Sequence, residues 1–294
     1  MAIPFIDLKT QYLSIKDKID SQIFKVLDHG AFVSGPEVGE LEKELCKFVG
    51  SKHALACSSG TDALQIALMA LGIGPGDEVI TTAFSFIATA EVILLVGAKP
   101  VYVDIDPITY NIDPSKIEAM ITKKTKAIMP VSLYGQIADM QAINEIAEKY
   151  KLSVIEDGAQ SFGSTQNGIR SCNLTTISGT SFFPAKPFGC FGDGGAIFTN
   201  DATLAKKMDL IRVHGQESRY YHTEIGLNGR LDTLQCAILL AKLPRYQWEL
   251  EQRNRLAANY EKAFKAIKKE GFAYPTLKPG NVSNWAQYTL RVPD

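Results

Sequence analysis

The feature that most restricts the fold of this chain is the alternation of short apolar runs with helical stretches up to residue 160. The apolar runs are bounded by turn residues and have the composition of buried strands. They lie at 53–57, 78–82, 100–103, 126–131 and 153–156. The helical stretches between them lie at 61–71, 85–96, 114–121 and 139–150. Because strands joined through helices run parallel, the pattern predicts an α/β fold with a mostly parallel sheet wound with helices.

The flanking segments give the expected domain organisation. Apolar positions at helical spacing stop at Gly30, and a second helix begins at Pro36 and ends near Gly50. Further strands and helices are expected at 175–183, 195–200, 202–211, 245–269 and 286–292. One strand cannot bury both its faces, so we expect residues 245–294 to be the truncated start of a small C-terminal α+β domain. Residues 1–244 would then form the large domain, including the N-terminal helical segment.

Charge and targeting signals exclude several classes of partner. The 31 basic residues balance 32 acidic ones, which leaves no general positive field for a nucleic acid. The N-terminus lacks the pattern of an export signal, and no apolar run is long enough to cross a bilayer. The five cysteines form no close pair, which argues against a disulfide framework and a metal site. We therefore expect a cytoplasmic protein without a metal, a membrane or a nucleic acid as partner.

The first candidate site is a serine and glycine turn between a predicted strand and a predicted helix. Ser58, Ser59, Gly60 and Thr61 occupy this turn, so backbone N–H groups at the helix N-terminus are available to an anion. A phosphate is the simplest such ligand. The alternative is that the turn only caps the helix.

The second candidate is an acidic residue at the carboxyl end of a buried strand. Asp157 follows the apolar run at 153–156, and Gln160 comes three residues later. Ligands of open α/β sheets bind at this edge, and a buried carboxylate needs a partner there. Capping of the following turn by Asp157 is the alternative.

The third candidate is a lysine held between two prolines. Lys186 lies between Pro184 and Pro187 in an otherwise apolar segment that leads to a glycine-rich turn. An amine in an apolar pocket loses proton affinity and becomes a nucleophile. The alternative is a lysine whose stem is buried and whose ammonium stays in water.

Together the three candidates match what pyridoxal phosphate needs. The cofactor requires a cradle for its phosphate, an anion at its ring nitrogen and an amine for its aldehyde. The turn at Gly60, the carboxyl group of Asp157 and the amine of Lys186 would supply one each.

At this point the chain resembles a known family, the DegT/DnrJ/EryC1/StrS sugar aminotransferases, which are pyridoxal-phosphate enzymes of fold type I. The likeness begins at Phe5-Ile6-Asp7-Leu8 and runs to the last residue. Its motifs are Gly35-Pro36-Glu37-Val38, Ser59-Gly60-Thr61-Asp62-Ala63-Leu64, Gly74-Pro75-Gly76-Asp77-Glu78-Val79, Glu156-Asp157, Gln160-Ser161, Ser181-Phe182-Phe183-Pro184 with Lys186, Gly192-Asp193-Gly194-Gly195, and Asn228 with Arg230-Leu231.

The resemblance implies a role for each matching residue. Lys186 would bond to the cofactor and later move the proton of the amino donor, and Asp157 would pair with the ring nitrogen. Gln160 would contact the ring or its phenolic oxygen. Phe86 would stack on the ring, although a core phenylalanine is the alternative.

The same resemblance implies a dimer. Gly60, Thr61 and the hydroxyl of Ser181 would hold the phosphate, joined by Asn228 of the neighbouring subunit. The active sites would then be shared within a homodimer. Gly158 departs from the family pattern, because relatives usually carry alanine there, and we expect this change to be tolerated.

Three further stretches resemble one branch of the family. This branch aminates a UDP-linked 3-oxo-N-acetylglucosaminuronate for bacterial surface polysaccharide such as O-antigen, with L-glutamate as the usual donor. The stretches lie at 131–136, 169–174 and 212–216. Another 3-keto or 4-keto nucleotide sugar is an alternative substrate, and a non-catalytic cofactor-binding fragment or dimer partner is a reading of another class.

Candidate substrate residues follow from the same branch. Arg230 could bind a carboxylate or a phosphate through its planar fork. His214, Tyr220 and Tyr221 lie in a loop that would reach the substrate. The alternative is that this loop packs on its own surface.

Overall fold

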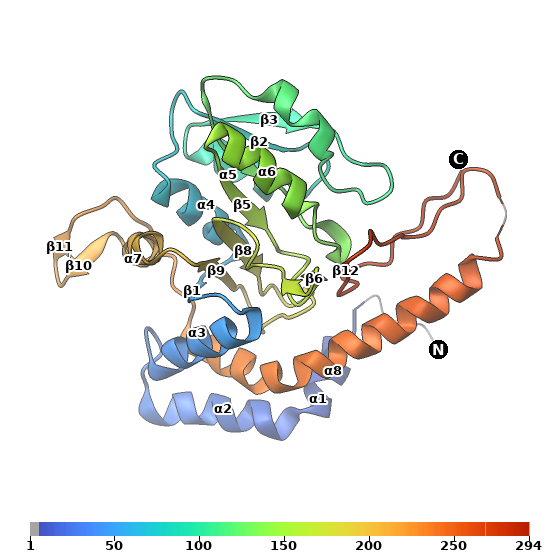
Figure 1. Ribbon diagram of the computed structural model, residues 1–294. Helices are drawn as coiled ribbons and strands as arrows, with labels where there is room; N and C mark the ends of the chain where they lie inside the picture. Colours follow the sequence, from blue (N-terminus) through green and yellow to red (C-terminus); the bar gives the residue numbers. More distant parts are fainter. Residues whose placement is uncertain (1–5, 268, 294) are drawn as a thin grey trace.

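The computed structural model describes residues 6–267 and 269–293, and its centre is a seven-stranded sheet (Figure 1). Phe5 of the first motif and Asp294 at the chain end lie outside these residues. The strand order is β1-β9-β8-β5-β4-β2-β3. The strands are β1 (His53–Cys57), β2 (Glu78–Thr82), β3 (Lys99–Val103), β4 (Thr125–Met129), β5 (Ser153–Asp157), β8 (Ile177–Ser181) and β9 (Gly195–Thr199). Strand β9 is antiparallel to both neighbours and the other four pairings are parallel, so the predicted mostly parallel sheet is confirmed.

Helices cover both faces of this sheet, and the strands are apolar on both sides accordingly. In β5, Ile155 belongs to the core under one layer of helices and Val154 to the core under the other. The first layer contains α4 (Gly60–Ala70), α5 (Ala88–Leu95) and α7 (Ala202–Ile211). The second contains α3 (Pro36–Val49), α6 (Met140–Tyr150) and α8 (Thr233–Phe264), with α2 (Lys16–His29) against α8 and α1 (Leu8–Ser14) before it. Successive side chains of β5 therefore enter different layers.

Local signals place most helix ends where the sequence predicts them. Gly30 and Gly50 take left-handed backbone angles, with φ of 69° and 88°, and end α2 and α3. The predicted helix at 114–121 is wrong. The structure has two short 3₁₀ turns there, η1 (Pro114–Lys116) and η2 (Glu118–Met120), because only Ile117 is buried and no apolar stripe forms.

The C-terminal part differs most from the prediction. Helix α8 begins at Thr233 rather than at residue 245 and continues through Pro244. Pro244 lies on the exposed side of the helix, where water can satisfy the carbonyl that loses its partner. The predicted domain boundary at residue 244 falls inside this helix and stays a prediction.

The predicted strand at 286–292 does not form. Among the described residues it has one isolated bridge, between Ala273 and Arg291, and none of the strands described lies alongside it to complete a ladder. The nearby strand β12 (Asn281–Val282) instead joins β6 (Thr165–Gln166) and β7 (Ile169–Arg170) in a small sheet.

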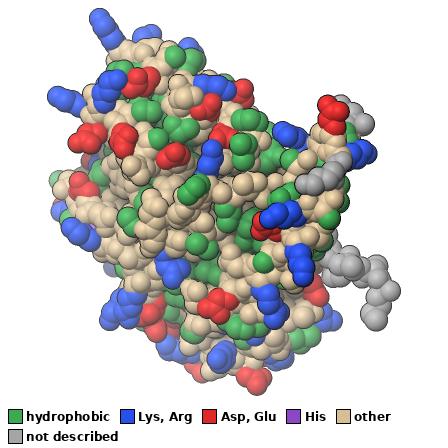
Figure 2. Space-filling model, turned by 45° about the vertical axis from the view of Figure 1, so that its right-hand side comes forward, with side chains coloured by type: hydrophobic (Ala, Val, Ile, Leu, Met, Phe, Trp, Pro, Cys, Tyr) green, Lys and Arg blue, Asp and Glu red, His purple; other side chains and the backbone are tan. Residues whose placement is uncertain are grey.

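Two peripheral features complete the description. A hairpin of β10 (Gln216–Ser218) and β11 (Tyr221–His222) projects from the body beside α7 (Figure 1), and η3 (Leu133–Gly135) follows β4. Acidic and basic side chains are interspersed over the face in Figure 2. None of the helices in the described ranges has both the length and the apolar character needed to span a membrane.

Candidate active site

The carboxyl ends of the parallel strands meet at one edge of the sheet, and the turns that follow them line a cavity of about 460 Å³. The cavity contains seven of the predicted site residues: Gly60, Thr61, Phe86, Asp157, Gln160, Ser181 and Lys186. These residues are up to 126 positions apart in the sequence. The fold therefore brings the three sequence candidates into one site.

The turn before α4 is built as an anion cradle. Ser59 caps the helix by accepting a hydrogen bond from the N–H of Asp62 at 3.0 Å. The N–H groups of Gly60 and Thr61 find no acceptor among the described residues. An added Cβ at Gly60 would lie 2.7 Å from the Cβ of Ser181, so glycine is needed for the turn to approach that hydroxyl. A phosphate fits this combination of free N–H groups, helix N-terminus and hydroxyl.

Asp157 lies buried at the end of β5. Its Oδ2 accepts a hydrogen bond from the hydroxyl of Thr89 at 2.8 Å, and its Oδ1 accepts one from the N–H of Ala159 at 3.2 Å. Burial raises the pKa of this carboxyl group, and the hydrogen bonds and the charge of Lys186 act in the opposite direction. A cationic ring nitrogen beside Asp157 would provide the partner that a buried carboxylate requires.

Sequence analysis missed Thr89, which orients this carboxyl group. Thr89 belongs to the first turn of α5, and its hydroxyl also lies 2.9 Å from that of Ser85, which lines the cavity. A hydroxyl in the first turn of a largely apolar helix is its only sequence signal.

Lys186 enters the cavity from the loop that follows β8. The backbone N–H of Lys186 donates to the carbonyl oxygen of Phe183 at 2.8 Å, which closes a tight turn around Pro184. Burial lowers the pKa of its amine, and the charge of Asp157 partly opposes this effect. The amine is therefore closer to its nucleophilic neutral form than an exposed lysine would be.

Gln160 and Phe86 both line the cavity. The Oε1 of Gln160 accepts a hydrogen bond from the N–H of Tyr134 at 2.6 Å, and Tyr134 has a left-handed φ of 57°. Phe86 is 74% exposed, so the alternative of a core phenylalanine is wrong. An exposed aromatic ring at the cavity mouth is free to stack on a ligand.

The remaining predicted residues do not line this cavity. Asn228 pairs with Val213 and Arg230 with Cys57 in isolated bridges outside it. His214, Tyr220 and Tyr221 lie in or beside the projecting hairpin, and the two tyrosines are 82% and 61% exposed. Within one chain, the structure does not bring these five residues to Lys186.

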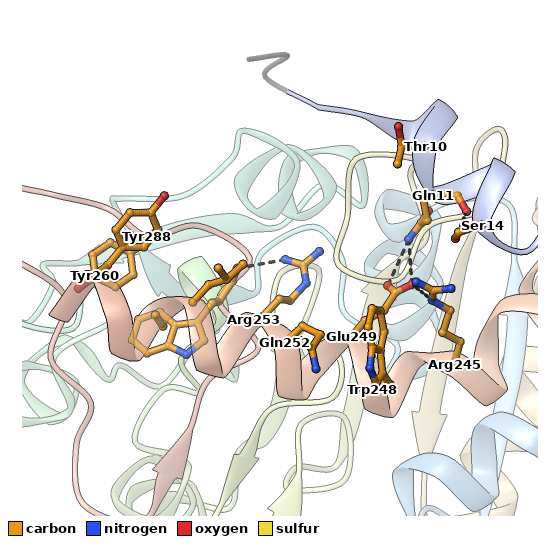
Figure 3. A pocket seen from close by; sticks show the side chains of 13 residues that line it. Thr10, Gln11, Ser14, Arg245, Trp248, Glu249, Gln252, Arg253, Tyr260 and Tyr288 are labelled. Carbon is orange, nitrogen blue, oxygen red and sulfur yellow. Dashed lines mark hydrogen bonds and ion pairs between the residues drawn. The ribbon is translucent and has the colours of Figure 1, made fainter. Parts of the chain in front are cut away.

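A second cavity of similar size, about 470 Å³, lies between α1 and α8 (Figure 3). Figure 3 shows Arg245, Trp248, Glu249 and Arg253 along α8, facing Gln11 and Tyr288. We call this second cavity the α8 groove. It contains none of the predicted site residues.

Comparison with known proteins places this geometry in a family. The profile of the DegT/DnrJ/EryC1/StrS aminotransferase family matches residues 13–294. A relative from Pseudomonas aeruginosa, named UDP-2-acetamido-2-deoxy-3-oxo-D-glucuronate aminotransferase, is 58% identical over 99% of this chain and 80% of its own length. One from Acidithiobacillus ferrooxidans, named UDP-N-acetyl-3-dehydro-alpha-D-glucosamine 3-aminotransferase, is 46% identical over 88% of this chain and 70% of its own.

A solved structure adds the cofactor. NtdA from Bacillus subtilis, solved with bound cofactor PMP, superposes with a TM-score of 0.91 at 38% identity, over 99% of this chain and 67% of that one. The anion cradle, the buried acid and the buried amine of the present cavity fit pyridoxal phosphate and its amino form, pyridoxamine phosphate (PMP). The chain therefore belongs to the DegT/DnrJ/EryC1/StrS aminotransferase family, and it is an aminotransferase of the fold type I architecture that depends on pyridoxal phosphate.

Proposed function

We propose that this aminotransferase moves an amino group from L-glutamate to the 3-keto carbon of a UDP-linked 3-oxo-N-acetylglucosaminuronate. The observation that carries the proposal is the 58% identity to the Pseudomonas aeruginosa enzyme over 99% of the chain. The relative from Acidithiobacillus ferrooxidans is named for a 3-keto sugar of the same nucleotide. The product would be a 3-amino sugar for bacterial surface polysaccharide such as O-antigen, made in the cytoplasm.

The chain's own residues divide the chemistry between them. When bound, pyridoxal phosphate supplies an electron sink and an aldehyde that carries the amino group. Lys186 is proposed to bind this aldehyde and then to move a proton between the donor's α-carbon and the cofactor. Asp157 would keep the ring nitrogen protonated, and Gln160 and Phe86 would orient the ring. Gly60, Thr61 and Ser181 would hold the phosphate.

We further propose a homodimer in which Asn228 reaches the phosphate of the partner's cofactor. Large apolar side chains are exposed just before α5, at its C-terminal end and just after the hairpin. They are Phe86, Ile87, Leu94, Leu95 and Ile225. Apolar exposure of this extent supports an interface, because burial of such side chains drives association. A partner would also bring Arg230, His214, Tyr220 and Tyr221 within reach of the neighbouring substrate.

The primary test compares the parent chain with Lys186→Ala. After addition of pyridoxal phosphate, the parent should show the visible absorbance of the lysine-bound cofactor, and L-glutamate should bleach it. Lys186→Ala should show neither change and should transfer the amino group at least about 10²- to 10⁴-fold more slowly. Lys43→Ala, which removes an exposed lysine, is the control. Bleaching by L-glutamate in Lys186→Ala would contradict the role of Lys186.

The substrate is tested by supplying three keto sugars to the glutamate-treated enzyme. The UDP-linked 3-oxo-uronate should recover the absorbance fastest, followed by the same sugar without its carboxylate and then by a 4-keto nucleotide sugar. A 4-keto sugar that reacts fastest would overturn the proposed substrate.

A mixture of two impaired variants tests whether the active site is shared between subunits. Lys186→Ala and Asn228→Ala subunits should each be impaired alone, because each variant lacks one component of every site. In a hybrid dimer one of the two sites combines both parental residues, so about a quarter of the parental sites should return after random mixing. No recovery after subunit exchange would contradict sharing.

A further inference from the structure

A buried carboxyl group on the opposite face of β5 has no place in the proposed chemistry. Glu156 precedes Asp157 in the strand, so its side chain enters the other helical layer. It is fully buried, with 0% exposure. Removing such a group from water is costly unless hydrogen bonds replace the lost hydration.

Five donors surround this carboxyl group. Its Oε1 accepts from the hydroxyls of Ser132 and Ser171, both at 2.8 Å, and from the hydroxyl of Ser161 at 3.5 Å. Its Oε2 accepts from the N–H of Cys172 at 2.8 Å and from the hydroxyl of Ser178 at 3.4 Å. Burial raises the pKa of Glu156, and these hydrogen bonds act in the opposite direction. Hydroxyls and a backbone N–H, rather than a cation, therefore hold the group in place.

Two of these donors connect Glu156 to the walls of the cofactor cavity. Ser132 lies between Val131 and Leu133, which both line the cavity, and its N–H donates to the carbonyl oxygen of Asp157 at 3.0 Å. Ser171 lies 2.7 Å from the hydroxyl of Ser161, the residue after Gln160.

The two walls also meet directly. The N–H of Tyr134, in the first wall, donates to the side chain of Gln160, in the second, at 2.6 Å. Glu156 thus joins the two loops through its side chain, and the bond between Tyr134 and Gln160 joins them a second time. A change in one loop would be transmitted to the other through the carboxyl group.

We propose that Glu156 is a positioning residue whose carboxyl group holds the Val131–Leu133 and Asp157–Ser161 loops at the separation that the cofactor ring requires. This inference rests on the proposed roles of Asp157 and Gln160. Glu156 touches neither the cofactor nor the substrate in this arrangement. It acts through the geometry of the residues that do.

The test compares two buried serines that donate to the same carboxyl group. Ser132 is 0% exposed and belongs to a cavity loop, whereas Ser178 is 1% exposed and belongs to strand β8. Ser132→Ala should bind pyridoxamine phosphate about tenfold more weakly, because a hydrogen bond to the buried carboxyl group and the tie to the loop are both lost. Ser178→Ala should stay within about twofold of the parent, because the sheet holds β8 in place and the lost bond is long.

Pyridoxamine phosphate is the probe because it has no aldehyde and forms no covalent bond with Lys186. Its affinity, measured by fluorescence titration, therefore reports the non-covalent fit of the cavity. Thermal unfolding of the cofactor-free variants gives the accompanying loss of stability. A purely structural role of Glu156 would lower the unfolding temperatures of both serine variants and leave both affinities at the parental value, and this result would overturn the inference.

A further variant changes the carboxyl group itself. Glu156→Gln retains the shape, and its amide can accept from Cys172 while it donates to the serine hydroxyls. Its affinity should fall about threefold, between those of the parent and Ser132→Ala. Parental affinity in both Glu156→Gln and Ser132→Ala would overturn the inference and leave the proposed function intact. A parent chain that does not bind the probe would overturn both.

Discussion

The cofactor cavity and the α8 groove have nearly equal volumes, about 460 and 470 Å³, yet they differ in the state of their charged groups. In the groove, Glu249 pairs with Arg245 at 3.4 Å and accepts a hydrogen bond from Gln11 at 3.2 Å. In the cavity, burial moves the pKa values of Asp157 and Lys186 away from their ordinary ranges. Cavity volume alone does not identify an active site. Reactive groups held in an environment that a ligand would complete do identify it.

The largest expected difference between the two regions is the effect of neutralising one carboxyl group in each. Asp157→Asn should lower the rate of amino transfer by about 10²- to 10³-fold, because a preorganised charge at the cofactor is lost. Glu249→Gln should stay within about twofold, since it removes a partly exposed ion pair far from the chemistry. Steady-state transfer from L-glutamate measures both. Equal losses in the two variants would mean that the groove takes part in the reaction.

The replacement of Asp157 that lowers activity should raise the stability of the cofactor-free chain at neutral pH. The pKa of Asp157 is raised in the folded chain, so its ionised form costs stability once the pH rises above that folded pKa. Without cofactor, Asp157→Asn should therefore resist urea better than the parent at neutral pH. The difference should vanish as the pH falls below 3.8, the ordinary pKa of this carboxyl group, because Asp157 is then protonated in both the folded and the unfolded chain. A variant that is less stable than the parent at neutral pH would contradict this sign.

A smaller effect is expected from the packing beneath the cavity. A Cβ added at Gly158 would lie 2.9 Å from the sulfur of Cys172 and 3.1 Å from the carbonyl oxygen of Gly179. Gly158→Ala should therefore lower the free energy of unfolding by about 1–3 kcal/mol. Gly39→Ala is the matched control, because nothing lies within 4 Å of its added Cβ. Urea unfolding measures both.

The same position has a built-in second test. Cys172→Ala removes the sulfur, so the double variant with Gly158→Ala should lose less stability than the two single variants together. Strict additivity would mean that the carbonyl oxygen of Gly179, rather than Cys172, causes the clash. Relatives with alanine at position 158 would then need a different backbone here.

The elements around the cavity could be predicted because their signals are local. The ranges 53–57, 78–82 and 202–211 match β1, β2 and α7 in full. Alternating apolar residues, turn glycines and capping serines all act within a few positions of one another. Local signals also pointed to the turn at Gly60 and to Asp157, which stand at element ends, and to Lys186, which lies between two prolines.

Contacts between distant segments could not be predicted from such signals. The hydrogen bond from Thr89 to Asp157 joins residues 68 positions apart, and the one from Ser132 to Glu156 joins residues 24 apart. Around the groove, we expected the helix to begin at residue 245, but α8 begins at Thr233, packs against α2 and α3 and continues through Pro244. Packing overrode the local signal there, since burial contributes more than one lost hydrogen bond.

The smallest expected effect separates the two regions most sharply. Arg253 lies in the groove and donates from Nη1 to the carbonyl oxygen of Trp285 at 3.1 Å. Arg253→Met keeps most of the apolar stem and removes this bond, so the free energy of unfolding should fall by about 0.5–1.5 kcal/mol. Arg253 lines the groove and not the cofactor cavity, and its link to Gln160 runs through the backbone of the 285–287 segment and Tyr134, so the affinity for pyridoxamine phosphate should change by less than about twofold. Fluorescence titration at the same temperature measures that affinity, and a shift as large as that of Ser132→Ala would show that the groove and the cavity form one coupled unit.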